Sequence, residues 1–173
     1  VNVAIKNALE TGALVVNYFG HGGEDGLAHE RVFTKPDAQE LNNVCKLNCF
    51  VTVTCEFTKF DNPLRPTAGE YTYWNKDGGA IGLITTTRQI FVQVGVAFNT
   101  VLEEYLFSYS DNDSYPDHEY PSMAESLRLT KIDPAISSTL QRRLVFFIGD
   151  PAMKLAFPQT MPQFQELQMF YRL

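Results

Sequence analysis

Four short apolar runs, each followed by glycine or by polar residues, constrain the fold of this chain most strongly. They cover residues 13–19, 49–54, 80–84 and 143–148. Runs of this length, rich in β-branched residues, are typical of strands buried on both faces of a sheet. Segments with helical spacing or helix-start signals separate them: residues 1–10, 37–46, 68–76, 92–107, and a helix that begins at 122. This alternation predicts an α/β domain with a mostly parallel sheet flanked by helices.

The composition is that of an ordinary globular domain. The 173 residues suit one domain with a sizeable core, and 45% hydrophobic with 20% charged residues fits that class. The formal net charge of −6 argues against nucleic acid as a partner, because binding phosphate needs a cationic face. No run approaches the roughly 20 apolar residues of a membrane-spanning helix. The chain starts with Val inside a segment of helical spacing, so we expect it to be a piece of a longer protein.

Three cysteines do not make a disulfide framework. Cys45 and Cys49 are four residues apart, with no second pair and no histidine nearby, which is a weak zinc pattern. We expect both to be small core residues, Cys45 on the helix and Cys49 on the strand that follows.

Two of the predicted strands end in residues that can perform chemistry. His21 lies in the glycine-rich loop after the first strand, and Cys55 follows the second strand. The two residues are 34 positions apart, which leaves room for one helical crossover between adjacent parallel strands. The carboxyl ends of such strands are where open α/β sheets place their sites. A cysteine acts through its thiolate, and a histidine can accept its proton and later protonate a leaving amine. The sequence therefore predicts a Cys55/His21 catalytic dyad.

The glycines around His21 would let a substrate carbonyl approach backbone N–H groups. We expect the amides of Gly22 and Cys55 to form an oxyanion hole, in which one donor contributes about 3 kcal/mol. Each residue alone has a structural alternative: a histidine in a glycine-rich turn is usually solvated, and a cysteine that ends an apolar strand is usually a core residue. Their placement at the ends of consecutive strands is what favours catalysis.

Four motifs, in this order along the chain, resemble the gingipain-type cysteine peptidases (family C25). They are Asn17-Tyr-Phe-Gly-His-Gly-Gly23, Val51-Thr-Val-Thr-Cys55, Gly79-Ala-Ile-Gly-Leu-Ile-Thr-Thr-Thr87 and Ile148-Gly-Asp-Pro-Ala-Met-Lys-Leu155. The resemblance implies a caspase-like fold with His21 as the catalytic histidine and Cys55 as the nucleophile. It also implies that residues 1–157 are the C-terminal part of a larger catalytic domain. Residues 158–173 would then be a tail or a linker to a following domain.

The resemblance further implies that the segment Thr85 to Phe91 borders the primary specificity pocket. Within it, Thr86, Arg88 and Phe91 are the expected substrate contacts, and Phe91 is the closest aromatic to a tryptophan of the gingipains. For Arg88 a surface ion pair is the alternative. The loop that begins at Glu56 differs from the gingipains' glycine-containing turn, so their preference for Arg or Lys does not carry over.

Within the family, the resemblance is closest to the sortases of type IX secretion. It implies a peptidase that cleaves C-terminal sorting domains from cargo proteins through a thioester at Cys55. The acyl group would pass to an amine of a surface glycolipid or to water. The expected partners are these cargo proteins and outer-membrane components of the secretion attachment complex. The expected location is the bacterial cell surface, at the outer membrane, after export through the periplasm.

Several functional groups of the family would lie outside this chain. A third catalytic group and most calcium-site residues would precede Val1, so no cofactor or metal is expected in these residues and any calcium belongs to the full-length protein. We therefore expect the 173 residues alone to be poorly active. One rival function is a catalytically silent domain that keeps the fold and binds export partners. A small-molecule acyltransferase is a weaker rival, because the chain has no acyl-carrier or cofactor motif.

Overall fold

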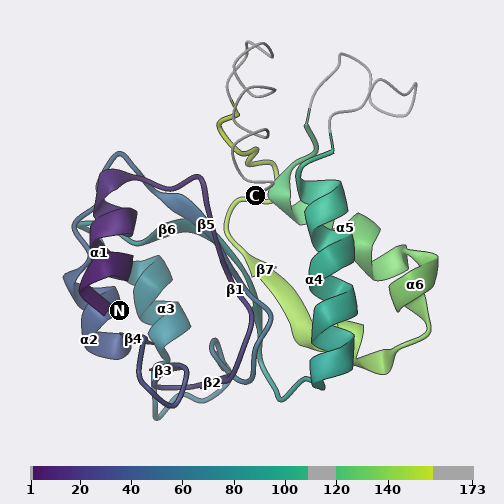
Figure 1. The fold of residues 1–173 in the computed structure, drawn as a ribbon, viewed down its shortest axis with the longest axis horizontal. Coiled ribbons are helices and arrows are strands. Elements are labelled where there is room, and N and C mark those ends of the chain that lie inside the picture. Colours follow the sequence, from purple (N-terminus) through teal and green to yellow (C-terminus); the bar gives the residue numbers. More distant parts are fainter. Residues whose placement is uncertain (1, 109–119, 158–173) are drawn as a thin grey trace, which may run out of the picture.

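The computed structural model describes residues 2–108 and 120–157. Its centre is a four-stranded sheet with the strand order β1-β5-β6-β7 (Figure 1). These strands are β1 (Val15–Tyr18), β5 (Asn48–Thr52), β6 (Ala80–Thr86) and β7 (Val145–Ile148). β1, β5 and β6 are parallel, and β7 runs antiparallel to β6. The expected α/β fold with a mostly parallel sheet is confirmed.

Helices cover both faces of this sheet (Figure 1). One side carries α1 (Asn2–Thr11), α2 (Lys35–Glu40) and α3 (Ala68–Trp74). The other side carries α4 (Val92–Leu106), α5 (Met123–Ile132) and α6 (Pro134–Ser137), and the 3₁₀ turn η1 (Leu140–Leu144) leads into β7. No helix within the described ranges is both long and apolar enough to cross a membrane. The expected tail at residues 158–173 lies outside the described residues.

The alternation of side chains along β5 builds two cores at once. Cys49, Val51 and Val53 pack into the cluster formed with α4 and α5. Phe50 points the other way and packs into the cluster formed with α1, α2 and α3. All residues of β5 are buried, which explains why its sequence is a continuous apolar run rather than an alternating one.

A second, smaller sheet was not predicted. The strands β2 (Gly22–Gly23), β3 (Gly26–Leu27) and β4 (Phe33–Thr34) pair antiparallel in the order β2-β3-β4. The sequence predicts a glycine-rich loop at residues 20–26 instead. Strands of two residues are too short to give a periodic pattern, so the sequence carries no signal for them. Gly26 is required in this sheet, because its φ is 152° and a side chain there would meet the Phe33 carbonyl.

The helix expected at residues 37–46 is shorter and begins earlier. Thr34 caps α2 in a capping box with Asp37, and the helix ends before Leu41. Cys45 lies in a turn with φ 65° and is exposed, so the expectation of a core helix residue was wrong. Cys49 is buried, as expected.

The buried Asn43 side chain holds the segment after α2 in place. Its Nδ2 donates to the carbonyls of Lys46 (3.1 Å) and Gly79 (2.9 Å), and its Oδ1 accepts from the Gly79 N–H at 2.6 Å. These bonds attach the segment after α2 to Gly79, in the turn before β6. Side-chain bonds of this kind compete with helix continuation, which accounts for the early end of α2.

We expect the substitution Asn43→Ala to lower the free energy of unfolding by about 2–4 kcal/mol, because it leaves the buried N–H of Gly79 without a partner and the Gly79 carbonyl with only the longer bond from Asn48. Urea denaturation of the full-length protein measures this change. The neighbouring, exposed Asn42 supplies the control, and Asn42→Ala should change the free energy by less than about 0.5 kcal/mol. Equal stabilities of the two variants would contradict the role given to Asn43.

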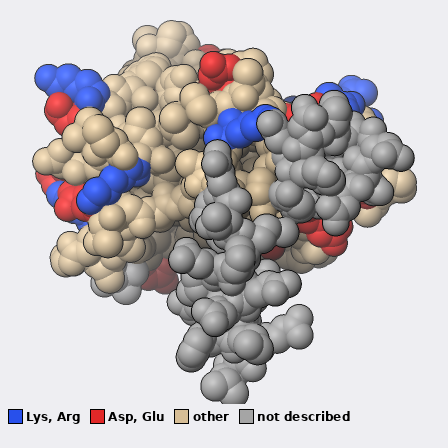
Figure 2. All heavy atoms as spheres, turned by 90° about the horizontal axis from the view of Figure 1, so that it is seen from above, with Lys and Arg blue, Asp and Glu red and all other residues tan. Residues whose placement is uncertain are grey.

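The face of the molecule drawn in Figure 2 has no large patch of one charge among the described residues. Figure 2 shows basic and acidic side chains in small mixed groups, with broad uncharged areas between them where the described residues are visible.

Candidate active site

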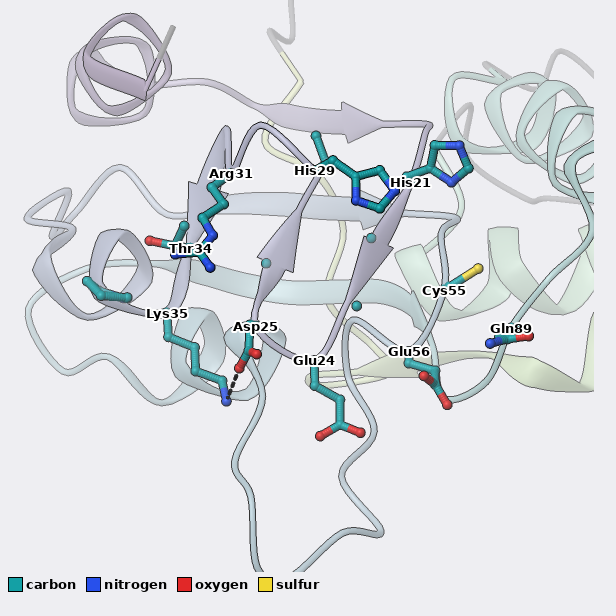
Figure 3. Close-up of a pocket in the computed structure, with 15 residues that line it drawn as sticks. His21, Glu24, Asp25, His29, Arg31, Thr34, Lys35, Cys55, Glu56 and Gln89 are labelled. Carbon is teal, nitrogen blue, oxygen red and sulfur yellow. Dashed lines mark ion pairs between the residues drawn. The ribbon is translucent and has the colours of Figure 1, made fainter.

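The parallel pairing of β1 with β5 brings the two predicted catalytic residues to the same edge of the sheet. Tyr18 pairs with Thr52 at the ends of these strands, and His21 and Cys55 each follow three residues later. Both residues line one open pocket of about 790 Å³ (Figure 3). The structure thus brings together His21, Gly22 and Cys55, as the sequence predicted.

The side chains of both residues have neighbours that the sequence did not indicate. The Cys55 thiol donates a hydrogen bond to the carbonyl of Ile90, with Sγ and oxygen 3.9 Å apart. The imidazole of His21 lies against that of His29, with ring centroids 5.5 Å apart and the planes tilted by 49°. His29, which the sequence gave no reason to single out, also lines the pocket.

Thr54 connects the His21 loop to the strand that carries Cys55. Its hydroxyl donates to the carbonyl of Gly20 at 2.6 Å. Its own carbonyl accepts a hydrogen bond from the Thr86 hydroxyl, on the opposite side. The carbonyl of His21 accepts two further bonds, from the Tyr18 hydroxyl (2.8 Å) and the Ala28 N–H (2.7 Å). Hydrogen bonds therefore hold the backbone at His21 and at Thr54, next to both candidate catalytic residues.

Other buried threonine hydroxyls bond to one another between β5, β6 and the loop after Cys55. Thr52 donates to Thr85 at 2.9 Å, and Thr58 and Thr85 are joined by a second hydroxyl pair at the same distance. Thr86 follows Thr85 in β6 and therefore faces the opposite side of the sheet. It is fully buried, and its hydroxyl donates to the carbonyl of Thr54. Buried hydroxyls need such partners, since an unpaired one costs about 1–3 kcal/mol. The side chain of Thr86 lies below the strand end and does not line the pocket.

The rest of the expected specificity segment lies beside the pocket. Glu56 N–H donates to the carbonyl of Arg88 at 3.4 Å, so this segment pairs with the loop after Cys55. The Arg88 guanidinium binds Asp61 with a distance of 2.9 Å between Nη1 and Oδ1, which is the ion pair given above as the alternative. That hydrogen bond lowers the pKa of Asp61. Phe91 is 69% exposed. Neither Arg88 nor Phe91 lines the pocket, whereas Gln89 between them does, so their contact with a substrate stays a prediction.

The acidic residues next to His21 are engaged by basic residues. Glu24 and Glu56 share the Lys59 ammonium, at 3.2 and 3.1 Å. Asp25 binds Lys35 at 2.8 Å and also Arg65. The hydrogen bond from Lys35 is the main reason that the pKa of Asp25 is lowered. Figure 3 shows the pair of Asp25 with Lys35 in the pocket lining, and within the described residues none of the three acids is hydrogen-bonded to His21.

The profile of peptidase family C25 matches residues 1–156. The chain belongs to this family, the gingipain-type cysteine peptidases. A structure of the Porphyromonas gingivalis RgpB pro- and mature domains superimposes with a TM-score of 0.72 and 17% identity. A structure of the Arg-specific cysteine proteinase gingipain R (RgpB) gives 0.69 and 18%. Each match covers 89% of this chain but only 37% and 36% of the other chain, so this chain spans little more than a third of those proteins. None of the curated proteins matches the sequence.

At these identities the likeness to the gingipain structures shows the fold, and the chemistry has to be argued from the site itself. The backbone N–H of Cys55 donates to no acceptor in the described part of the chain, so it is available to a ligand. Glu56, the next residue, has φ 51°, which a non-glycine residue rarely adopts. This turn orients the Cys55 amide and thiol at the end of the strand. No three His, Cys, Asp or Glu side chains within residues 2–108 and 120–157 are arranged to hold a metal ion.

We expect Gly22→Ala to slow labelling of Cys55 by a peptide-like thiol-directed probe about ten- to a hundred-fold, because a misplaced catalytic group costs that much. A Cβ at Gly22 would lie 2.6 Å from Thr54 Oγ1 and 2.8 Å from its Cγ2, and would displace the bond from Thr54 to Gly20.

Gly23→Ala is the matched control for this variant, because a Cβ at Gly23 meets no atom within 4 Å. Labelling rates of the full-length wild type and both variants should separate the two positions. A Gly22→Ala protein that reacts as fast as Gly23→Ala would contradict the role of the Thr54 contact.

The three cysteines should differ sharply in alkylation. Burial raises the pKa of Cys49 to about 12. At pH 8 its thiolate fraction would then be about one in ten thousand. We expect iodoacetamide to modify the exposed Cys45 in the folded full-length protein and to leave Cys49 unmodified until urea unfolds it. Peptide mapping by mass spectrometry measures both sites, and modification of Cys49 at the rate of Cys45 would contradict the burial argument.

Proposed function

We propose that this chain carries the nucleophile and the general base of a sortase-type cysteine endopeptidase/transpeptidase of the PorU kind, which acts in type IX secretion. One observation carries the proposal. Cys55 and His21 follow adjacent parallel strands at equal offsets and line the same pocket. Membership of family C25 supports the reaction class.

The proposed reaction begins with transfer of the Cys55 thiol proton to His21, after the thiol turns away from the Ile90 carbonyl. The thiolate attacks the carbonyl carbon of the scissile bond, and the amides of Cys55 and Gly22 stabilise the resulting oxyanion. Collapse breaks the C–N bond, and His21 returns the proton to the leaving amine of the sorting domain. An amine of a surface glycolipid then attacks the thioester and gives up a proton to His21; the C–S bond breaks, and the proton returns to the sulfur of Cys55. Water in the same role would give hydrolysis.

The loop after Cys55 supports a substrate preference unlike that of gingipain R. In this chain, Glu56 stands in place of the gingipains' glycine-containing turn and lines the pocket next to Cys55. Its carboxylate is bound by Lys59 and is thereby partly neutralised. We therefore do not extend the Arg specificity in the name of gingipain R to this chain.

The proposed partners follow from the sortase function. They are cargo proteins with C-terminal sorting domains and outer-membrane components of the attachment complex, at the bacterial cell surface. Nucleic acid is not a proposed partner, in keeping with the net charge of −6 and the mixed charges in Figure 2. The upstream part of the full-length protein would supply the third catalytic group and any calcium site.

The rival proposal is a catalytically silent domain that binds export partners. It requires neither a free amide at Cys55 nor a histidine beside it. The presence of both favours the enzyme.

We expect Cys55→Ala to abolish labelling of the full-length protein by a thiol-directed peptide probe. Loss of the general base in His21→Ala should slow labelling by about a hundred-fold or more. Cys45→Ala controls for the exposed second thiol and should leave labelling unchanged. Persistent labelling of Cys55→Ala would remove this cysteine as the nucleophile.

The second step is tested separately with a small amine acceptor. Peptide cleavage in the presence of glycinamide should give an amide product as well as the free acid, in a ratio that rises with the acceptor concentration. Wild-type protein that neither reacts with the probe nor cleaves any peptide, yet binds cargo, would favour the silent binding module.

A further inference from the structure

The pocket at Cys55 continues along the small sheet to a second wall. This wall is formed by Arg31, Thr34 and Lys35, at the end opposite to Cys55 and Gln89 (Figure 3). Arg31 lies in the turn between β3 and β4, which the sequence did not predict. The same continuous space therefore joins the nucleophile to a basic residue on a different element.

The charges in this pocket are unequally compensated. The acidic residues Glu24, Asp25 and Glu56 are each in an ion pair with Lys59, Lys35 or Arg65. This leaves no uncompensated carboxylate among the acids that line the pocket. Arg31 differs, because no acid of the described residues lies within ion-pair distance of its guanidinium. The far wall therefore presents a cation, and the imidazole of His29 lies on the same lining.

The backbone of Arg31 is fixed, although its side chain has no acidic partner. Its N–H donates to the carbonyl of Ala28 at 3.2 Å, and its carbonyl accepts from Asn2 Nδ2 at 2.7 Å. Its φ is 54°, a conformation that glycine adopts without penalty and that costs other residues about 1–2 kcal/mol. A charged residue held in this conformation on a pocket wall points to a use for its side chain.

We propose that Arg31 binds the carboxylate of an Asp or Glu side chain in the peptide substrate, away from the scissile bond, and so determines substrate preference. A guanidinium can hold a carboxylate through two parallel N–H···O bonds, which fixes direction as well as charge. A peptide that reacts at Cys55 and extends through the pocket passes this wall. The proposal rests on the peptidase function and names part of its substrate class.

The test compares peptides that carry Glu or Gln at each position in turn around the cleaved bond. An extended peptide advances about 3.3 Å per residue, so one position should reach the guanidinium. For full-length wild-type protein we expect Glu at that position to raise kcat/KM about two- to five-fold over Gln, as for an exposed ion pair. Added salt should reduce the ratio.

Variants assign the preference to Arg31. Arg31→Gln should bring the Glu/Gln ratio to about one, and Arg31→Lys should keep part of it, because the charge remains but the paired N–H donors are lost. Arg143→Gln is the matched control. This residue is exposed and does not line the pocket, so its loss should leave the ratio unchanged.

The outcomes separate this inference from the proposed function. Peptide cleavage with a Glu/Gln ratio near one at every position, or with a ratio that Arg31→Gln leaves unchanged, would overturn the role of Arg31 and leave the peptidase intact. An Arg31→Gln protein that forms the thioester normally but transfers the acyl group slowly to an amine acceptor would indicate that Arg31 binds the acceptor. That result would overturn its proposed role in binding the peptide. Failure of the wild type to react with any peptide or probe would remove the peptidase function itself.

Discussion

The hydrogen bonds of Thr54 are the interaction on which the rest of the candidate site depends. The hydroxyl of Thr54 binds the loop of His21, and its carbonyl accepts from Thr86 at the end of β6. Thr54 is fully buried, so these polar groups cannot turn to water without leaving a partner unsatisfied. Three chain segments far apart in sequence are thereby held at one sheet edge. Cys55, the next residue, has its position set by this junction rather than by its own contacts.

The features that could be predicted from sequence are those that depend on burial over several residues. β5 was recognisable because all its residues are buried, with Cys49 and Val51 against one helical layer and Phe50 against the other. A run of this kind has few other interpretations. Once the strands are known, parallel pairing places the residues after them side by side, so the sequence predicts that His21 and Cys55 lie close together. The proximity of these two residues is a consequence of topology.

The features that could not be predicted depend on single contacts. The small sheet has strands of two residues, and its register follows from hydrogen bonds rather than from a pattern, so Arg31 and His29 were not placed at the pocket. The helix expected to reach Lys46 ends early because one side chain, Asn43, bonds across the fold to Gly79. The resemblance implied Thr86 as a substrate contact, but its side chain is buried and its hydroxyl donates to the carbonyl of Thr54. These features depend on contacts with residues distant in sequence, and a local sequence pattern contains no information about such contacts.

The residues assigned to the reaction and the residues that line the rest of the pocket are held in place by different kinds of interaction. The groups assigned to the reaction lie next to the buried hydrogen bonds of Thr54, so altering their positions means breaking these bonds at about 1–3 kcal/mol each. The remainder of the pocket is lined by charged side chains such as Glu24, Asp25 and Lys35, whose ion pairs contribute about 0–1 kcal/mol. Substitution of those charges would change the pocket while leaving the sheet edge intact. A fold held in this way can keep one reaction and vary its substrates, which is why the gingipain-type fold by itself does not fix the substrate of this chain.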